Sequence, residues 1–408
     1  DKDSYDIRSA NGVHIYDYKS QESIFVTDGG NRHLKDDYYT NFYDYKKVRY
    51  NSRVIIPTLG WNPDDGLKIG LGGVVNVNGF DSEYFSASHS FSGHVFFATG
   101  GFDLNYSGEF SEIFKDTFLG VNARITSPNF AVNFFGFGNS TPNLSTQGSE
   151  QEEKDLDFNR VRQSNLEIGT SLIKRGGYGS YFSIGVKYHS IGIENTQGRF
   201  INEFLQGDED PANDEFFNAE LNYRYTNADN PAYPTLGLDF NLTFGYNNNL
   251  NNSKDFSYLI SWLGMAHKLD ARGKLVLASK VGTQINLGDD FEFYQAANIG
   301  DNNGLRGYRT ERFSGKRSLY QTTDLRYNLR RAKTSLLPIE YGFYLGFDYG
   351  RVWVADELVE APEFNTNRLN TSYGGGFFLN LVDTLSANVG LFHSADSWRF
   401  TFGFGFGF

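Results

Sequence analysis

Apolar and polar side chains alternate along most of this chain, from about residue 50 to its end. The closing stretch WRFTFGFGFGF places Trp398, Phe400 and Phe402 on one face of an extended segment. Arg399 and Thr401 fall on the opposite face. Successive side chains of a strand point to opposite faces, whereas a helix would spread these aromatic rings around its circumference. The pattern therefore predicts strands with one apolar and one polar face.

The same alternation recurs in about sixteen segments, which predict sixteen strands. They cover residues 50–60, 67–79, 86–98, 101–113, 117–127, 157–174, 179–191, 215–227, 236–247, 255–269, 274–288, 317–330, 339–353, 371–382, 385–395 and 398–408. Long connections, at about 128–156, 192–214, 289–316 and 354–370, alternate with tight ones. Membrane barrels have this asymmetry, with long outer loops and short periplasmic turns. We therefore predict an all-β fold, a 16-stranded antiparallel transmembrane β-barrel.

Two parts of the chain differ in pattern. Residues 49–408 form the predicted outer-membrane β-barrel, whereas residues 1–48 mix short extended runs with turn signals. We interpret 1–48 as a periplasmic linker or as the tail of an upstream domain. Because the chain begins at Asp1 without a methionine or a signal segment, we expect a processed chain or a fragment.

Composition agrees with a barrel and excludes other classes. Aromatic residues make up 17% of the chain, and 45 glycines accompany only 9 prolines, which suits strands with aromatic girdles. The mean hydropathy of −0.47 does not argue against this, because barrel strands are apolar on one face only. No stretch approaches the length of apolar sequence that a transmembrane helix needs. A net charge of −12 argues against a nucleic-acid partner.

Little in the sequence points to catalysis. The absence of cysteine removes thiol nucleophiles and thiolate metal ligands. The seven histidines show no metal-ligand spacing, since His89 and His94, for example, would lie on opposite faces of a strand. The acidic run 206–215 is better explained as a solvated outer loop than as a calcium site. We expect no enzyme, no metal and no cofactor in this chain; any catalytic domain would lie upstream.

Three stretches go beyond the general barrel pattern. They are ADNPAYPTLGLDF (228–240) at a predicted periplasmic turn, NNGLRGYRTERFSGKRSLYQTTDLRYNL (302–329), which begins inside the long predicted loop 289–316, and YLGFDYGRVW (344–353) in a late strand. Their order, together with the terminal Phe408, resembles the BamA-type outer-membrane assembly and translocation superfamily, also called the bacterial surface antigen family. The resemblance covers roughly 50–408. It implies a barrel in the bacterial outer membrane that assists the insertion or translocation of proteins.

The resemblance also implies a lock inside the barrel. In that family an Arg-Gly-aromatic tip of the sixth outer loop folds back into the barrel and meets an acid on the inner wall. The matching residues here are Arg306, Gly307, Tyr308 and Asp348. The alternation of side chains along the strand independently places Asp348 on the lumenal face. A carboxylate there is stabilised by a cation, and arginine can bind it with two hydrogen bonds. We expect the loss of Arg306 to matter more than the loss of Arg312, for which no motif supplies a partner.

One departure from the family pattern concerns the strand after this loop. Arg326 stands where the family tends to have an inner-wall glutamate. Two alternatives follow: Asp324 acts as a second acid for Arg306, or the lock resembles the version found in the secretion transporters of that superfamily.

The mechanism that the resemblance implies rests on a weak seam between the first and last strands. Pro57 has no backbone N–H, so the first strand lacks one hydrogen-bond donor for pairing with a neighbouring strand. Glycines weaken the last strand. The expected seam residues are Pro57, Gly403, Gly405, Gly407 and Phe408. A client strand could pair with such an edge once it opens.

Other functions stay open at this point: a passive channel or receptor barrel, or the membrane-anchoring barrel of a phosphatase- or lipase-fused protein. The stretches GWNPDDGLKIGLG, FFATGGFDLNYSGEF and NFFGFGNST resemble the Bacteroidota branch in which a calcineurin-like metallophosphatase precedes the barrel. The metal-binding motifs of such a phosphatase, and repeated POTRA modules, do not occur in this sequence. The expected partners are outer-membrane lipid and lipopolysaccharide, client outer-membrane proteins, and accessory periplasmic or lipoprotein subunits, but no nucleic acid.

Overall fold

A computed structural model describes most of the chain. The described residues are 3–7, 13–26, 30–36, 51–62, 66–78, 85–114, 117–144, 155–205, 213–333, 338–381 and 385–404. Near the N-terminus, β1 (Ser4–Tyr5) pairs in parallel with β3 (Ile24–Phe25), and β2 (His14–Asp17) pairs in parallel with β4 (Asn31–Leu34). None of these short strands joins the main sheet. The division of the chain near residue 48 stays a prediction.

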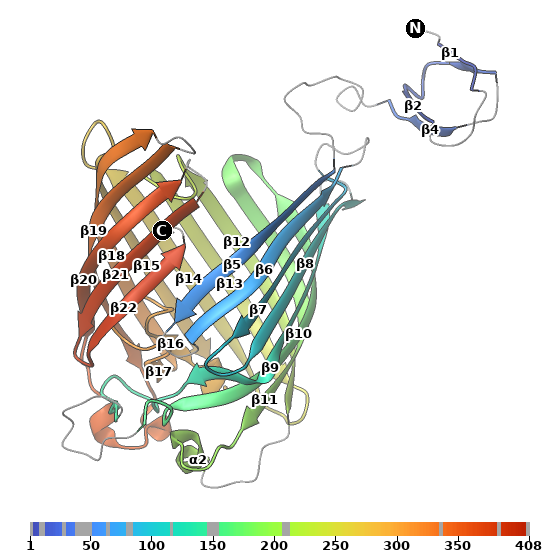
Figure 1. Cartoon of the computed structure of the whole chain (residues 1–408). Helices are drawn as coiled ribbons and strands as arrows, with labels where there is room; N and C mark the ends of the chain where they lie inside the picture. Colours follow the sequence, from blue (N-terminus) through green and yellow to red (C-terminus); the bar gives the residue numbers. More distant parts are fainter. Residues whose placement is uncertain are drawn as a thin grey trace.

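Sixteen antiparallel strands form one sheet that curves into a barrel (Figure 1). The strands are β5 (Ser52–Asn62), β6 (Gly66–Val77), β7 (Ala87–Phe96), β8 (Phe102–Phe114), β9 (Thr117–Asn133), β10 (Arg160–Arg175), β11 (Ser180–Glu194), β12 (Asp214–Ala228), β13 (Gly237–Asn249), β14 (Asp255–Lys268), β15 (Leu275–Leu287), β18 (Arg317–Lys333), β19 (Pro338–Trp353), β20 (Asn370–Leu381), β21 (Leu385–Ser394) and β22 (Trp398–Phe404). The predicted barrel of sixteen strands is confirmed. Each predicted strand lies within a few residues of an observed one.

The largest difference in strand length is in β9. The sequence predicts that this strand ends at residue 127, before Pro128, but it continues to Asn133. The ladder with β10 shifts register here, because Thr126 faces Asn165 whereas Phe130 faces Gln163. Proline cannot donate a ladder hydrogen bond and is tolerated at such a bulge, so the strand passes through it.

The alternation of side chains separates an apolar exterior from a polar interior. In β19, Phe343, Leu345 and Phe347 are exposed on the outer surface, while Tyr344 and Asp348 are buried toward the lumen. Because strand side chains alternate, the same division recurs along the wall. Such an exterior suits contact with lipid acyl chains. No helix among the described residues is long and apolar enough to cross a membrane.

A hairpin from the longest outer loop lies inside the barrel. Its strands are β16 (Ala297–Ile299) and β17 (Phe313–Gly315), and the tip between them covers residues 300–312. Five side chains form a buried cluster around this hairpin: Ile299, Leu305, Tyr308, Phe313 and Val352. The hairpin is thus packed against the wall strand β19, which contributes Val352.

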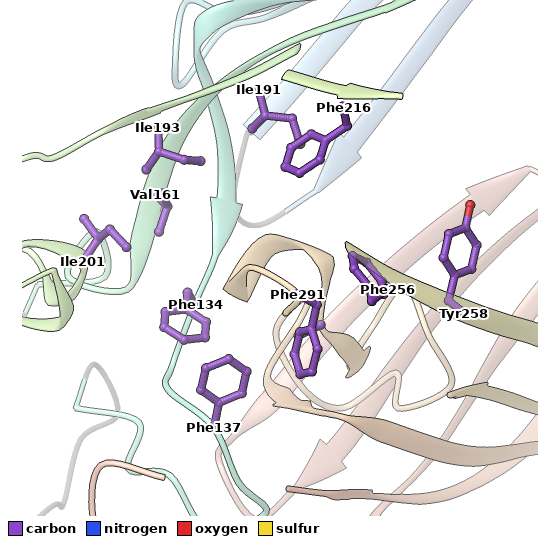
Figure 2. Packing of buried hydrophobic residues seen from close by; sticks show 11 residues of the cluster. Phe134, Phe137, Val161, Ile191, Ile193, Ile201, Phe216, Phe256, Tyr258 and Phe291 are labelled. Atoms are coloured by element: carbon purple, nitrogen blue, oxygen red, sulfur yellow. The ribbon is translucent and has the colours of Figure 1, made fainter. Parts of the chain in front are cut away.

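Aromatic side chains pack where the long loops meet. The ring of Phe134 lies with its centroid 5.4 Å from that of Phe137, 4.9 Å from Phe204 and 4.7 Å from Phe293. Figure 2 shows Phe134, Phe137 and Phe291 beside one another in the same cluster. Short helices contribute to these loops: α2 (Phe200–Phe204), η2 (Phe293–Gln295), η3 (Asp356–Leu358) and η4 (Pro362–Phe364), while η1 (Gly177–Gly179) lies in a short turn. The long loops gather at the end of the barrel that lies away from the N-terminus (Figure 1).

The sheet has two ends. Its strand order runs from β22 to β5, and no bridge joins these two strands among the residues that the structure describes. The described part of β22 covers Trp398–Phe404, and β5 covers Ser52–Asn62. Figure 1 shows the two strands facing each other on the same side of the barrel.

We predict that Phe377→Arg destabilises the barrel by about 2–4 kcal/mol, because its side chain is 67% exposed on the outer face of β20 and would place a cation in lipid. Urea unfolding in phospholipid vesicles, followed by tryptophan fluorescence, measures the loss. Asn122→Arg is the matched control, since Asn122 lines a lumenal cavity beside Glu167. Equal losses in the two variants would contradict the assignment of the faces.

Candidate functional site: the loop tip and the inner-wall acids

Arg306 at the loop tip binds two carboxylates of the barrel wall. Its Nε lies 3.2 and 3.1 Å from the two oxygens of Asp348, and its Nη2 lies 2.5 Å from Asp348 Oδ1. Nη1 donates to Asp324 Oδ1 at 2.7 Å. The backbone N–H of Arg306 also donates to Asp348 Oδ2, at 3.1 Å. The guanidinium therefore bridges β18 and β19, which carry these two acids.

The wall is shaped to receive this guanidinium. In the ladder Asp324 faces Gly346, two residues from Asp348, so both acids point into the lumen on neighbouring strands. A Cβ at Gly346 would lie only 2.6 Å from Arg306 Nη2, so a glycine leaves the space that the guanidinium fills. On its other side the guanidinium carbon lies 4.3 Å from the centre of the Phe392 ring, a cation–π contact.

Attraction between opposite charges offsets the cost of burying this site. The side chain of Asp348 has no exposure to solvent, and it accepts a further hydrogen bond from Ser372 Oγ at 2.8 Å. Burial opposes the charge of Arg306, but the attraction of Asp324 and Asp348 outweighs it and holds the pKa of Arg306 above its usual value. A fully buried carboxylate and a partly buried guanidinium thus stabilise each other.

The two residues after Arg306 are also held. A Cβ at Gly307 would lie 2.7 Å from Ser372 Cβ and 3.0 Å from the carbonyl oxygen of His393, so no larger residue fits without displacement. The carbonyl of Gly307 accepts a hydrogen bond from Ser394 Oγ at 2.7 Å. Tyr308 is 1% exposed and packs edge-on against Phe313. The structure thus places Arg306, Gly307 and Tyr308 against β19 to β21.

Arg312, for which no motif supplies a partner, is nevertheless bound by several side chains. Its Nε donates to Asp396 Oδ2 at 2.7 Å, and its Nη1 donates to Thr141 Oγ1 at 2.8 Å. The guanidinium carbon lies 4.7 Å from the ring centre of Phe135 and 4.5 Å from that of Phe313. These partners are distant in the sequence and belong to no motif. The one feature of the sequence that could have indicated a shared role is the regular spacing of three residues between Arg306, Arg309 and Arg312.

Arg309 reaches a third part of the wall. Its Nη2 donates to Asn133 Oδ1 at 2.6 Å, at the end of β9, and its Nη1 donates to the carbonyl of Leu156 at 3.0 Å. The three arginines of the tip therefore bind three separate segments, and the tip is held from several sides of the lumen.

Arg326, the departure from the family pattern, extends the ion network. Its Nη2 donates to Asp324 Oδ2 at 3.2 Å, so Asp324 lies between the guanidiniums of Arg306 and Arg326. The Arg326 guanidinium carbon also lies 5.9 Å from the ring centre of Tyr233. Tyr233 belongs to the turn between β12 and β13, which the sequence places on the periplasmic side.

This turn, residues 229–236, folds into the barrel. Tyr233 is 2% exposed and stacks on Phe378, with ring centroids 4.9 Å apart, in a buried cluster with Tyr344 and Phe392. Burial raises the pKa of Tyr233 to about 12. The carboxylate of Asp229 accepts the backbone N–H groups of residues 235 and 236, at 2.9 and 3.1 Å, and so holds the shape of the turn. Sequence reasoning found the turn but missed this role.

A polar cavity of about 290 Å³ lies beside the ion network. Arg306, Arg326 and Lys280 line it together with Asp301 and Asp324. On the far side it reaches Thr401, Phe402 and Gly403 of β22. Asp301 of the loop tip also forms an ion pair with Arg399 of β22 at 3.7 Å. The loop tip is therefore linked to the last strand of the sheet.

The predicted seam residues are only partly described. Pro57 lies in β5, in register with Leu71, and Gly403 lies in β22, in register with Asn388. Gly405, Gly407 and Phe408 lie outside the described residues. Within the described ranges, no group of three or more His, Cys, Asp or Glu residues could hold a metal ion.

Comparison with known proteins gives one family match and several solved structures of similar fold. Residues 212–360, which include the loop tip and both acids, match the profile of the family described as haemolysin secretion/activation protein ShlB/FhaC/HecB. A search of curated protein sequences found no match. These results, with the solved structures below, support a place in the superfamily of BamA- and ShlB-type barrels. The protein is a barrel of the bacterial outer membrane.

Solved structures show the same fold at low sequence identity. BamA from Haemophilus ducreyi lacking POTRA domains 1–3 aligns with a TM-score of 0.63 and 14% identity, over 95% of this chain and 73% of that chain. CdiB from Escherichia coli aligns with a TM-score of 0.56 and 10% identity, over 88% of this chain and 63% of that chain. The chain thus spans less than two thirds of CdiB. None of these matches tests the narrower resemblance to phosphatase-fused barrels.

We predict that Arg306→Ala frees the loop tip, because Asp348 and Asp324 would lose their shared cation. The rate of limited proteolysis at residues 300–312 measures the release of the tip. The measurement uses folded barrel, which is recognised by its change of mobility on heating in gel electrophoresis. Arg368→Ala, which removes an exposed arginine from the loop after β19, is the control and should leave the cleavage rate unchanged. Equal cleavage of both variants would contradict the anchoring role of Arg306.

A second prediction concerns the inward turn. Tyr233→Ala removes the stacked ring below Arg326 and should raise the cleavage rate at the loop tip, although the substitution lies in another segment. Tyr178→Ala is the matched control, because Tyr178 lies in the short turn after β10 and is 90% exposed. An unchanged cleavage rate in Tyr233→Ala would show that the turn does not support the tip.

Proposed function

We propose that this barrel assists the insertion or translocation of proteins at the outer membrane, and that it does so by opening between β5 and β22. The observation that carries the proposal is the link between the loop tip and the last hairpin of the sheet. Asp301 pairs with Arg399, Arg312 pairs with Asp396, and the carbonyl of Gly307 accepts a hydrogen bond from Ser394. The matches to BamA, CdiB and the ShlB family support the same class of function.

The end strands of the sheet have the property that such a function needs. Each backbone N–H or C=O group left unpaired in lipid costs several kcal/mol, so the edges of β5 and β22 favour any partner that can pair with them. An extended client segment meets this need by adding a strand to one edge. Pro57 in β5 cannot donate to such a ladder, which weakens direct closure of the barrel at that point.

The loop tip would act as the lock on this opening. Withdrawal of Arg306 leaves Asp348 as a buried charge without a counter-ion, and breaking a buried ion pair in this way costs about 3–5 kcal/mol. The same tip is bound to β21 and β22. Movement of this last hairpin would therefore pull on the tip and would require the energy of separating Arg306 from Asp348. The partners that fit this mechanism are client outer-membrane proteins, with lipid, lipopolysaccharide and accessory subunits around the barrel.

Site-specific crosslinking tests the proposal. A photo-reactive side chain at Ser52 in β5, or at Thr401 in β22, should form adducts with newly made outer-membrane or secreted proteins in cells. Ser261, in the middle of β14, is the control, because β14 is paired on both sides and should give no client adducts. The seam mechanism is wrong if adducts fail to form at both end strands or form equally at Ser261.

A further inference from the structure

Two arginines face outward at the outer end of β18 and β19. Arg317 and Arg351 both lie at odd-numbered positions, which in these strands carry the exposed side chains such as Leu319, Leu325 and Phe347. In the ladder Arg317 faces Trp353, and Leu319 faces Arg351. Diagonal neighbours of this kind lie about 7–8 Å apart, so the two cations share one patch with the indole ring of Trp353.

The Arg351 side chain is held in place but keeps unused donors. Its guanidinium carbon lies 4.5 Å from the ring centre of Trp353, and its Nη2 donates to Asn367 Oδ1 at 2.8 Å. Its Nε is buried without a hydrogen-bond partner among the described residues. No carboxylate of the described residues forms an ion pair with Arg317 or Arg351. The patch therefore has two cations without a counter-ion in the described part of the chain, which favours an anion from outside the chain.

Three other cations near the outer end of the barrel are already paired. Arg162 at the start of β10 pairs with Glu194 at 3.2 Å, and Lys254 before β14 pairs with Glu292 at 2.7 Å. Lys316, beside Arg317, pairs with Asp289 at 2.6 Å. Arg317 and Arg351 differ from these three residues because the protein supplies them with no counter-ion in the described part of the chain.

The position of the patch along β19 indicates which leaflet of the membrane surrounds it. Below Arg351, the outward positions of β19 are Tyr349, Phe347, Leu345 and Phe343, which form the apolar part of the wall. An apolar band of this kind is about 25 Å tall, and tryptophan and tyrosine mark its borders. Arg351 and Trp353 thus lie at the border on the side of the long loops, which is the outer leaflet. There the lipid is lipopolysaccharide, whose phosphorylated glucosamine headgroup is anionic.

We propose that Arg317, Arg351 and Trp353 form a binding site for a phosphate group of lipopolysaccharide. The guanidinium groups bind phosphate oxygens with paired hydrogen bonds, and Arg351 is already oriented for this by Trp353 and Asn367. The indole ring packs against the sugar or acyl chain at the border of the membrane. The proposal depends on the outer-membrane location and is independent of the proposed role in protein insertion.

The position of this site gives it a structural consequence. β18 and β19 carry Asp324 and Asp348 on their inner face and the two free arginines on their outer face. A lipid phosphate bound by Arg317 and Arg351 would neutralise the outer charges and join the two strands from outside. The wall segment that holds the loop tip would then be braced on both faces.

Lipid binding to the purified full chain tests the site. The barrel is folded in nanodiscs of phosphatidylethanolamine, and bisphosphorylated lipid A, dephosphorylated lipid A and phosphatidylglycerol are titrated and measured by native mass spectrometry. We expect the double variant Arg317→Gln/Arg351→Gln to bind bisphosphorylated lipid A at least roughly tenfold more weakly, a loss of about 1.4 kcal/mol. The control Arg162→Gln removes an outward cation that is already paired, and it should bind like the unaltered protein.

The other lipids separate the sources of the phosphate. Weak binding of dephosphorylated lipid A and of phosphatidylglycerol supports a site for lipopolysaccharide phosphate. Equal binding of phosphatidylglycerol, or displacement of lipid A by millimolar inorganic phosphate, would overturn the assignment to lipopolysaccharide. Unchanged affinity in a double variant that still folds, as judged by its heat-dependent gel shift, would overturn the site itself.

Discussion

The position of the long outer loop depends on one buried carboxylate. Asp348 has no contact with solvent, and a charge in such a place must be paired and hydrogen-bonded, since its burial otherwise costs several kcal/mol. Arg306 supplies both the cation and a backbone donor, and Ser372 supplies a hydroxyl donor. A loop conformation that withdraws Arg306 leaves this charge without a partner. The loop tip is therefore held inside the barrel rather than at its outer rim.

From this ion pair the contacts extend to distant parts of the chain. Asp324 is shared between Arg306 and Arg326, and Arg326 lies over Tyr233 of the inward turn. On the other side, Arg312 and Asp301 connect the tip to the hairpin of β21 and β22. These contacts link the short-turn end of the barrel, the loop tip and the last strand into one network. A change at any of the three places is therefore expected to alter the stability of the other two.

The barrel wall serves different purposes on its two faces. β18 and β19 present acids to the lumen and exposed apolar side chains to lipid, with two arginines at the outer border. This division follows from the period of two in an extended strand, which allows neighbouring residues to lie in water and in lipid. It also explains how a chain with a mean hydropathy of −0.47 can span a membrane.

The amino-acid sequence by itself determined the sixteen strands, their two faces and the placement of Asp348 on the inner wall, because the period of two is a local property of the backbone. Its motif order also indicated Arg306 as the partner of Asp348. Only the tertiary structure decided that Arg312 meets Asp396, that Tyr233 reaches Phe378, and that β9 continues past Pro128. These contacts join residues far apart in the chain, and they depend on barrel curvature and on ladder register, which no local pattern encodes.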